Sequence, residues 1–484
     1  MSLAPSSSPR RRSQSKDSTA LIERYRHELD HLFRLRRFGM HPGLDVIHAL
    51  LSGLGRPEQS FPAVHVAGSK GKGSVAAMAA GILSAHGLRT GLYTSPHLQS
   101  YRERIQIDRT PIGRKGVVEG LDRIRPLAES LLTQGAIDQA PTFFETTTAL
   151  AFDYFARERV DVAVVEVGMG GRLDATNSIR APVGVITTIE YEHTEFLGTT
   201  LTAIAHEKAG ILHPGMVGVI GEIKSEPLAE IDRCARDRGV PLAHWGRELR
   251  CEDRVLSERG QRFTIVTPGC HYEGVELPLF GIFQPANAAV AVASVERLFE
   301  ATRRTPDPER VREGLAKTRW RGRIERTARG PDLFLDVAHT PESARGLAQS
   351  LAEIYPFAAA ADNAILFGCL ADKMVEPMLD ALAPLAQTIV VTPVRSDRTA
   401  SPDDLRRAAL GRFPFIVRAP GSKEGLALAR AATDRVGFTL VAGSDYLVGE
   451  ILNDQEGRVE GEPDLSDPVT PISDGTAARA RAAR

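Results

Sequence analysis

The sequence predicts an α/β protein with two domains, each built around a mainly parallel β-sheet. Three observations support this prediction. The chain has 484 residues, more than a single hydrophobic core ordinarily serves. Patterns typical of strands and of helices alternate along most of it. The runs 162–165 and 183–186 contain no charged or polar side chain, which is typical of parallel strands buried on both faces.

The N-terminal domain is expected to begin with two helices. One starts near Thr19, where apolar residues recur at helical spacing, and the other covers residues 44–54. Strands and helices then alternate, as in a parallel sheet with helices on its faces. The expected strands are residues 63–67, 90–94, 160–167 and 183–189, and the expected helices are residues 75–85 and 146–157.

The pattern changes in the second half of the chain. Residues 214–280 are strand-rich and irregular, and a helix of small residues is expected at 287–300. A second α/β series follows, with strands expected at 333–337, 364–367, 388–394 and 438–442. We therefore expect domains at 19–318 and 319–454. The basic, Ser-rich segment 1–18 and the polar segment 455–484 are expected to be disordered.

Composition excludes several classes of protein. Sixty Lys and Arg residues balance 61 Asp and Glu residues, so no overall field attracts nucleic acid or an anionic membrane. No apolar stretch is long enough to span a bilayer. The four cysteines have neither CxxC nor Cys/His ligand spacing, so neither a zinc site nor a disulfide framework is predicted. These features favour a cytoplasmic protein.

A glycine-rich loop lies between the first expected strand and the helix at 75–85. It reads Gly68-Ser69-Lys70-Gly71-Lys72-Gly73-Ser74. Glycines let backbone N–H groups surround phosphate oxygens, and the following helix adds its positive dipole. Lys72 would reach the β- and γ-phosphates, and the Ser74 hydroxyl would bind phosphate or Mg²⁺. The spacing departs from the usual Walker pattern, but the lysine and serine favour ATP over a dinucleotide.

Polar residues follow several of the strands. Glu166 ends a buried run and His193 follows the next strand, at the edge where parallel sheets bind ligands. Ser95 ends the strand at 90–94 and is a third candidate ligand. Two of them have an alternative interpretation: Glu166 as a partner of Arg172, and His193 as a surface residue. Lys208, taken alone, is typical of a solvated helix face.

With these residues in place, the chain resembles the folylpolyglutamate synthase/dihydrofolate synthase family, a branch of the Mur ligase superfamily. The resemblance spans about residues 38–452. It rests on the loop GSKGKGS, TSPHL at 94–98, ERI at 103–105, TFFE at 142–145, EVGMGGRLDATN at 166–177, EKAGI at 207–211, Gln284, Asn287, Gly322-Arg323, DVAH at 336–339, Asp372-Lys373 and YLVGE at 446–450. It implies a Mur-ligase-like central domain with a P-loop and a parallel sheet, and a smaller Rossmann-like C-terminal domain.

The resemblance also implies roles for individual residues. Mg²⁺ ligands match Ser95, Glu166 and His193, and Lys208 matches a lysine that is carbamylated by carbon dioxide. ATP-binding positions match Gly68, Gly71, Lys72, Gly73, Ser74, Asn287, Arg323 and Asp336. Pterin-binding segments match Thr142, Phe143, Phe144, Glu145, Leu173, Asp174 and Ala175. His339 is a candidate helper near glutamate or phosphate, and Lys72 and Lys208 are further catalytic candidates.

The implied reaction is ATP-dependent addition of L-glutamate to dihydropteroate, to reduced folates or to both, through an acyl phosphate, by a monomer. Departures from the family's pattern include Ser69 and Lys70 in the loop and Glu192 before His193. Two alternatives remain. One is a Mur-type ligase for another carboxylate, although only about 50 ordered residues precede the loop, too few for an extra substrate domain. The other is a P-loop module that binds ATP as a switch.

Overall fold

The computed structural model describes residues 18–35, 43–356 and 362–462. The larger lobe contains eight strands in one sheet: β1 (Ala63–Ala67), β2 (Thr90–Tyr93), β3 (Ile105–Ile107), β4 (Thr110–Pro111), β5 (Val162–Glu166), β6 (Val183–Ile186), β7 (Val217–Ile220) and β8 (Leu242–His244). Their order is β4-β3-β2-β5-β1-β6-β7-β8. The six strands from β2 to β8 in this order are parallel, and β3 and β4 add an antiparallel edge.

Both faces of this sheet are buried, as the apolar strand runs predict. Side chains of Ala63 and Ala67 in β1 join one hydrophobic core, and those of Val64 and Val66 join the other. The first core includes helices α1 (Thr19–Arg34), α2 (Asp45–Gly53), α4 (Arg114–Thr133), α5 (Phe143–Arg157), α7 (Leu201–Ala209) and α8 (Ser225–Asp237). The second includes α3 (Lys72–Ala85), α9 (Gln284–Ala301) and α10 (Pro308–Ala316). A single turn, α6 (Thr194–Leu197), precedes α7.

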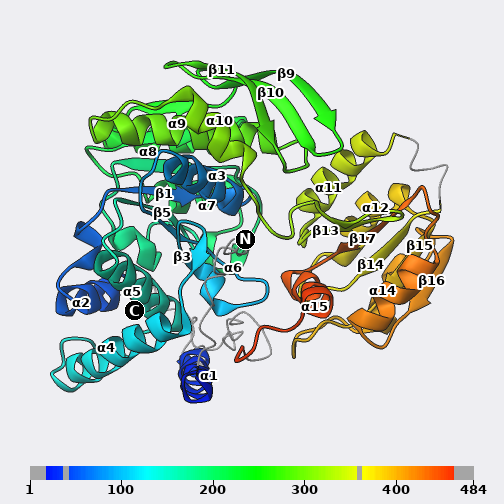
Figure 1. Ribbon diagram of the computed structural model, residues 1–484, viewed down its shortest axis with the longest axis horizontal. Coiled ribbons are helices and arrows are strands. Elements are labelled where there is room, and N and C mark those ends of the chain that lie inside the picture. The colour runs from blue at the N-terminus through cyan, green and yellow to red at the C-terminus, as the bar shows by residue number, and fades with distance from the viewer. Residues whose placement is uncertain (1–17, 36–42, 357–361, 463–484) are drawn as a thin grey trace, which may run out of the picture.

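The irregular stretch 214–280 contains β7, α8, β8 and a separate antiparallel sheet. That sheet consists of β9 (Arg250–Ser257), β10 (Gly260–Val266) and β11 (His271–Leu277) in the order β11-β10-β9. Its inner residues Phe263, Ile265 and Tyr272 pack into the core that contains α9, so the sheet covers that side of the larger lobe (Figure 1). The strand-rich pattern was therefore correct, but it did not reveal the helix α8.

The smaller lobe is a second α/β unit. Its sheet contains β12 (Glu325–Ala328), β13 (Asp332–Leu335), β14 (Ala364–Phe367), β15 (Thr388–Val391), β16 (Phe415–Arg418) and β17 (Phe438–Ala442) in the order β12-β13-β17-β14-β15-β16. All pairs except β12–β13 are parallel. One face packs on α11 (Pro341–Ile354), α12 (Val375–Leu382) and α13 (Pro402–Ala409), and the other on α14 (Ser422–Ala431) and α15 (Asp445–Glu456).

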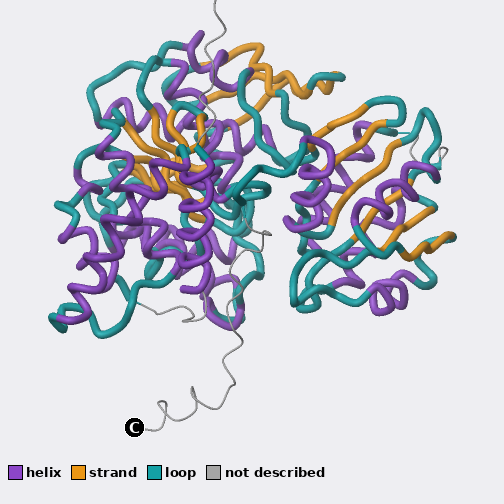
Figure 2. Tube along the Cα trace, turned by 60° about the horizontal axis from the view of Figure 1, so that its bottom comes forward, coloured by secondary structure: helices purple, strands orange, loops and turns teal. Residues whose placement is uncertain are grey.

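The chain passes between the lobes at residues 317–324. Helix α10 packs against α3 in the larger lobe, and β12 begins the second sheet, so the predicted boundary at 318/319 lies within this stretch. The two lobes are separate bodies joined by loops in both ribbon and tube views (Figures 1 and 2).

The predicted disorder of 455–484 is wrong for residues 455–462. After α15 the chain returns to the larger lobe, where Glu462 is 5% exposed and its carboxylate is buried. It accepts hydrogen bonds from the hydroxyl of Tyr25, at 2.7 Å, and from the backbone N–H of Tyr101, at 3.2 Å. These contacts order the segment because they satisfy a buried charge. Residues 463–484 and 1–17 of the predicted tails lie outside the described residues.

Within residues 18–35, 43–356 and 362–462, no helix combines the length and apolar character needed to cross a bilayer.

Candidate active site

The loop between β1 and α3 is shaped by its glycines. Gly68 and Gly71 have φ angles of +138° and +88°, in the left-handed region that favours glycine. A Cβ atom on Gly68 would lie 1.8 Å from Thr187 Oγ1, and one on Gly71 would lie 2.7 Å from Asn287 Oδ1. Gly71 is also the N-cap of α3. The loop therefore leads directly into the positive end of a helix dipole, where an anion is stabilised.

Three cationic side chains gather at this loop: Lys70 and Lys72 belong to it, and Arg323 lies close to it. The Nζ atom of Lys72 donates to the carbonyl oxygens of Gly68, at 2.9 Å, and Ser69, at 3.4 Å. Burial lowers the pKa of Lys70, and the charges of Lys72 and Arg323 lower it further while Glu192 opposes them. Positive charges this close together repel one another, so a polyanion bound here would relieve the repulsion.

Glu166 and Ser95 meet at the carboxyl edge of the larger sheet. Glu166 is the last residue of β5 and is 3% exposed, and its Oε2 accepts the backbone N–H of Ser95 at 3.0 Å. Burial raises the pKa of its carboxyl group, and the nearby Lys72 opposes this shift. A buried carboxylate beside a hydroxyl offers the oxygen ligands that Mg²⁺ prefers.

His193 follows β6 with a φ angle of +47° and opens toward the same cavity. Its ring lines the cavity, and desolvation by the surrounding walls lowers its pKa to about 4. The neighbouring Glu192 opposes this shift, whereas Lys208 and Lys72 add to it. The imidazole is therefore neutral near pH 7 and can act as a nitrogen ligand. The donor set of Ser95, Glu166 and His193 fits a divalent cation.

Lys208 lies behind the loop. It is 1% exposed, and its Nζ donates to Gly68 O at 3.0 Å and to Glu192 Oε1 at 2.6 Å. Burial lowers the pKa of Lys208 to about 8. Burial would by itself raise the pKa of Glu192, but the ammonium groups of Lys208, Lys72 and Lys70 outweigh it and hold that pKa well below its usual range. This ion pair is the arrangement of an unmodified lysine.

The N-terminus of α5 forms an aromatic wall of the site. Thr142 and Glu145 make a capping box, in which Thr142 Oγ1 accepts the Glu145 backbone N–H and Glu145 Oε2 accepts the Thr142 backbone N–H. This cap aims the two residues between them, Phe143 and Phe144, at the cavity. The Arg104 guanidinium lies 5.3 Å from the centre of the Phe143 ring. The predicted pterin segment thus provides flat apolar surfaces with a cation beside them.

In the second predicted pterin segment, the polar side chain hydrogen-bonds to the backbone of its own loop. Asp174 accepts the backbone N–H groups of Met169, at 2.9 Å, and Thr176, at 3.0 Å. Burial raises the pKa of this carboxyl group, while these hydrogen bonds favour its charged form. Leu173, Asp174 and Ala175 all line the cavity, but the Asp174 carboxylate mainly holds the loop that places its neighbours there.

The smaller lobe supplies the opposite wall. Asp336 is 6% exposed and accepts the backbone N–H groups of Ile324 and Ala338, each at 2.8 Å. Arg323 lies on the crossing between the lobes and lines the same cavity. His339 Nδ1 donates to Val337 O at 2.9 Å, and burial lowers its pKa well below the usual value. The ring is neutral, so its Nε2 carries a lone pair.

Two family models match the chain. They are the Mur ligase middle domain, at residues 66–295, and the Mur ligase, glutamate ligase domain, at residues 322–444. A dihydrofolate synthase/folylpolyglutamate synthase of Mycobacterium tuberculosis is 40% identical over 413 residues, which cover 82% of this chain and 83% of that protein. The chain belongs to the folylpolyglutamate synthase/dihydrofolate synthase family of Mur ligases.

Solved structures of this family have the same fold. Mycobacterium tuberculosis folylpolyglutamate synthase complexed with ADP superposes with a TM-score of 0.84 at 35% identity, covering 91% of this chain and 100% of that chain. E. coli FolC in complex with DHPP and ADP superposes with a TM-score of 0.78 at 26% identity, covering 89% of this chain and 98% of that chain. The predicted fold class, a Mur-ligase domain followed by a C-terminal α/β domain, is confirmed.

The residues that the family resemblance singled out line one cavity of about 640 Å³ between the lobes. They are Gly71, Lys72, Gly73, Ser74, Ser95, Thr142, Phe143, Phe144, Glu145, Glu166, Leu173, Asp174, Ala175, His193, Asn287, Arg323, Asp336 and His339. Gly68 and Lys208 do not line it and contact each other behind the loop. The sequence assigned no role to Arg104, which lines the cavity although it is only 2% exposed.

The loop geometry predicts the effect of Gly71→Ala in this family member. Alanine at a left-handed φ angle costs roughly 1–2 kcal/mol, and its Cβ would also press on Asn287. We expect the affinity for ATP to fall by about tenfold or more, which corresponds to about 1.4 kcal/mol. Nucleotide titration measures this. Gly87→Ala is the matched control, because Gly87 has a φ angle of +81° but no atom within 4 Å of its Cβ position; an equal loss of ATP affinity there would contradict the local explanation.

Proposed function

We propose that this chain is an ATP-dependent ligase that joins L-glutamate to dihydropteroate or to the terminal glutamate of reduced folates. The observation that supports this most strongly is one cavity with three kinds of wall. A phosphate-binding loop, an aromatic surface and a polar surface from the second lobe all face it. The ADP and DHPP bound by relatives are the ligand types that such walls accommodate.

The chemistry proceeds in two stages. The acid's carboxylate attacks the γ-phosphorus of ATP, and ADP leaves, which gives an acyl phosphate. The amino group of L-glutamate then attacks the acyl carbon, and inorganic phosphate leaves as the amide forms. Lys72 and Arg323 neutralise charge on the transferring phosphoryl group, so catalysis rests on positioning and electrostatics. No side-chain nucleophile is needed.

Ser95, Glu166 and His193 would hold Mg²⁺, which when bound neutralises charge on the phosphates of ATP. The backbone N–H of Ser95 fixes the carboxylate of Glu166 in this position. The neutral state of His193 keeps its ring available as a ligand rather than as a competing cation.

His339 is proposed to accept a proton from the attacking amino group. Its Nδ1–H is held by the carbonyl oxygen of Val337, which directs the lone pair of Nε2 away from that backbone. Because the ring is neutral, it can take up the proton that the new amide nitrogen loses. Asp336 acts beside it by fixing the backbone at Ile324 and Ala338.

Lys208 is proposed to carry a carbamate when the enzyme is active. Its lowered pKa leaves part of the amine unprotonated near neutral pH, and the free amine is the form that reacts with carbon dioxide. In forming the carbamate, nitrogen bonds to the carbon of CO₂ and one N–H proton goes to solvent. The product would replace a cation by an anion behind the loop, which requires Glu192 to move.

The modification has a direct spectroscopic test. With ¹³C-bicarbonate, we expect a carbamate resonance in the wild-type protein that is absent in Lys208→Ala. We also expect Lys208→Ala to lose most of its turnover and to recover part of it with acetate, which restores an anion. Lys224→Ala is a matched control, because Lys224 also pairs with a glutamate, Glu190, but its side chain is 40% exposed rather than buried. A resonance that survives in Lys208→Ala would contradict the assignment.

Phosphate release tests the function as a whole. The assay contains ATP, Mg²⁺ and L-glutamate, with dihydropteroate or tetrahydrofolate added separately. Stimulation by both indicates a bifunctional enzyme, and stimulation by one indicates a specialist. Oxygen-18 in the acid's carboxyl group should appear in the released phosphate. Glutamate-independent release, or no label transfer, would favour the ATP-binding switch or a different carboxylate substrate. A cytoplasmic location and a monomeric state remain predictions.

A further inference from the structure

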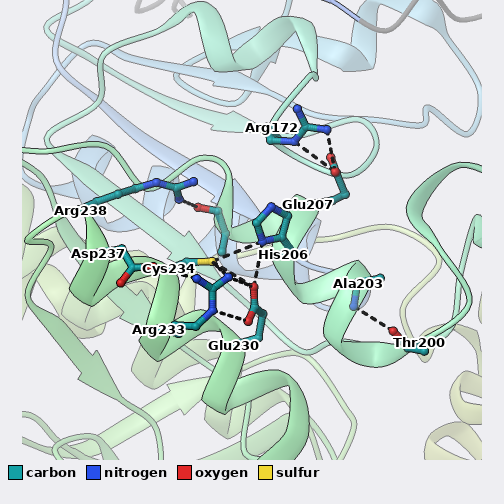
Figure 3. A network of polar contacts seen from close by, with 11 residues as sticks. Arg172, Thr200, Ala203, His206, Glu207, Glu230, Arg233, Cys234, Asp237 and Arg238 are labelled. Atoms are coloured by element: carbon teal, nitrogen blue, oxygen red, sulfur yellow. Dashed lines mark hydrogen bonds and ion pairs between the residues drawn. The ribbon is translucent and has the colours of Figure 1, made fainter.

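A second group of ligand atoms lies away from this cavity, between α7 and α8. His206 from α7 and Glu230 and Cys234 from α8 point toward one another (Figure 3). Among the described residues, this is the one group of three His, Cys, Asp or Glu side chains whose ligand atoms all lie within 4.8 Å of one another. None of the three lines the cavity between the lobes.

The distances between these atoms suit a tetrahedral metal ion. Cys234 Sγ lies 3.7 Å from His206 Nδ1 and 3.4 Å from Glu230 Oε1, and the last two atoms are 2.8 Å apart. Around Zn²⁺, with Zn–S about 2.3 Å and Zn–N about 2.0 Å, neighbouring ligand atoms lie roughly 3.3–3.6 Å apart. Only the His206–Glu230 contact must widen, by roughly half an ångström.

The chemistry of the three groups selects the kind of metal. Thiolate and imidazole ligands favour zinc and similar transition metals over Mg²⁺, which prefers oxygen. Glu230 and Cys234 are four residues apart on one helix, so they share a face. Cys234 is 3% exposed, whereas the His206 side chain is 45% exposed. The ion would therefore have a buried ligand on one side and would be accessible from solvent on the other.

Arg233 and Asp237 complete the surroundings. Arg233 donates to both oxygens of Glu230, at 2.9 and 2.6 Å, and through Nη1 to Asp237 Oδ2 at 2.8 Å. Its guanidinium therefore satisfies the carboxylate when no metal is bound and competes with a cation. Because Asp237 is already a second partner, Arg233 can release Glu230 Oε1 without losing every anionic contact.

We propose that His206, Glu230 and Cys234 form a binding site for a zinc-type divalent cation, with a water molecule as the fourth ligand. Binding forms bonds from the metal to sulfur, nitrogen and oxygen, and the thiol proton of Cys234 passes to solvent. The bound ion joins α7 to α8. Since α7 also carries Lys208, two residues after His206, the ion would fix the helix that supports the back of the phosphate loop.

Cobalt provides the test, because a cobalt–thiolate bond produces a charge-transfer absorption that needs no nucleotide or folate. The metal-free full-length protein is titrated with Co²⁺ in the presence of excess Mg²⁺. We expect one equivalent to produce the absorption and Zn²⁺ to displace it. Cys234→Ser should abolish the absorption. His206→Gln, at a half-exposed position, should leave the fold intact and weaken binding by at least the ~10–100-fold that loss of an outer partner costs.

Two further variants separate a metal site from a hydrogen-bonded network. Arg233→Gln removes the competing cation and should tighten Co²⁺ binding several-fold, whereas a purely structural role predicts no gain. Cys251→Ser removes another partly buried thiol and should leave the titration unchanged. Absence of the absorption in the wild-type protein, or its persistence in Cys234→Ser with a normal circular dichroism spectrum, would overturn the proposal. Neither result depends on ligase activity, so failure here and failure of the proposed function are distinguishable.

Discussion

Lys72→Met is expected to lower the turnover of ATP by about 10²–10³-fold, the loss typical of removing one donor that stabilises transition-state charge. The ammonium group lies over the phosphate loop, 2.9 Å from Gly68 O, so it needs only a small movement to reach a bound phosphate. Methionine keeps the length of the side chain and removes its charge. Steady-state phosphate release with saturating ATP and L-glutamate measures the effect.

The control for this variant is Lys317→Met. Lys317 is exposed and its Nζ pairs with Glu313 at 2.6 Å on the surface of α10. Surface ion pairs of this kind contribute about 1 kcal/mol or less. We expect Lys317→Met to retain normal turnover. Lys72→Met with turnover within a few-fold of the wild type would remove this lysine from the chemistry.

Arg323→Ala is expected to reduce turnover by a similar factor, about 10²-fold or more, since it also removes a cation from the reacting phosphate. The reason differs, because Arg323 comes from the crossing between the lobes and faces the loop from the other side. Its loss should therefore impair the closed state in which both walls contact the nucleotide. We expect kcat to fall more than the affinity for ATP, as measured by turnover and by nucleotide titration.

A conservative variant and a control variant test the role of Arg323. Arg323→Lys keeps the charge but not the planar fork and should recover only part of the activity. Arg319→Ala, four residues earlier, is the control: it removes an exposed arginine whose guanidinium donates to the backbone carbonyls of Ala316 and Thr318. Near-normal turnover in Arg323→Ala, or an equal loss in Arg319→Ala, would refute the assigned role.

The buried parts of the fold could be predicted from the sequence because burial leaves a clear pattern. The apolar run at 63–67 matches β1, and the strands at 364–367 and 438–442 match β14 and β17. Strand β16 was missed because it lies at the edge of its sheet, where Phe415 and Arg418 are exposed and no two-sided burial selects apolar residues. Helix α8 was missed although its buried residues Ile231, Cys234 and Ala235 recur at helical spacing, because the stretch 214–280 was interpreted as a whole from its strands.

The candidate site was also only partly predictable from the sequence. Glu166, Ser95 and His193 could be placed together because strand ends share one edge of a parallel sheet. The partner of Lys208 could not, since its contact with Glu192 depends on how α7 packs behind the loop. The absence of zinc-ligand spacing among the cysteines was likewise uninformative about Cys234. Its nearest ligand-type neighbours come from its own helix and from α7, 28 residues away in sequence.

The return of residues 457–462 to the larger lobe has a consequence for motion. The smaller lobe is covalently joined to the larger lobe at residues 317–324, and the segment after α15 is held there through Glu462, whose carboxylate accepts hydrogen bonds from Tyr25 and Tyr101. The side-chain amide of Gln99 also donates to Asn453 of α15 at 3.3 Å. Any rotation of the smaller lobe about residues 317–324 must therefore move or break these noncovalent contacts, and a truncation before Glu462 would remove those made by Glu462.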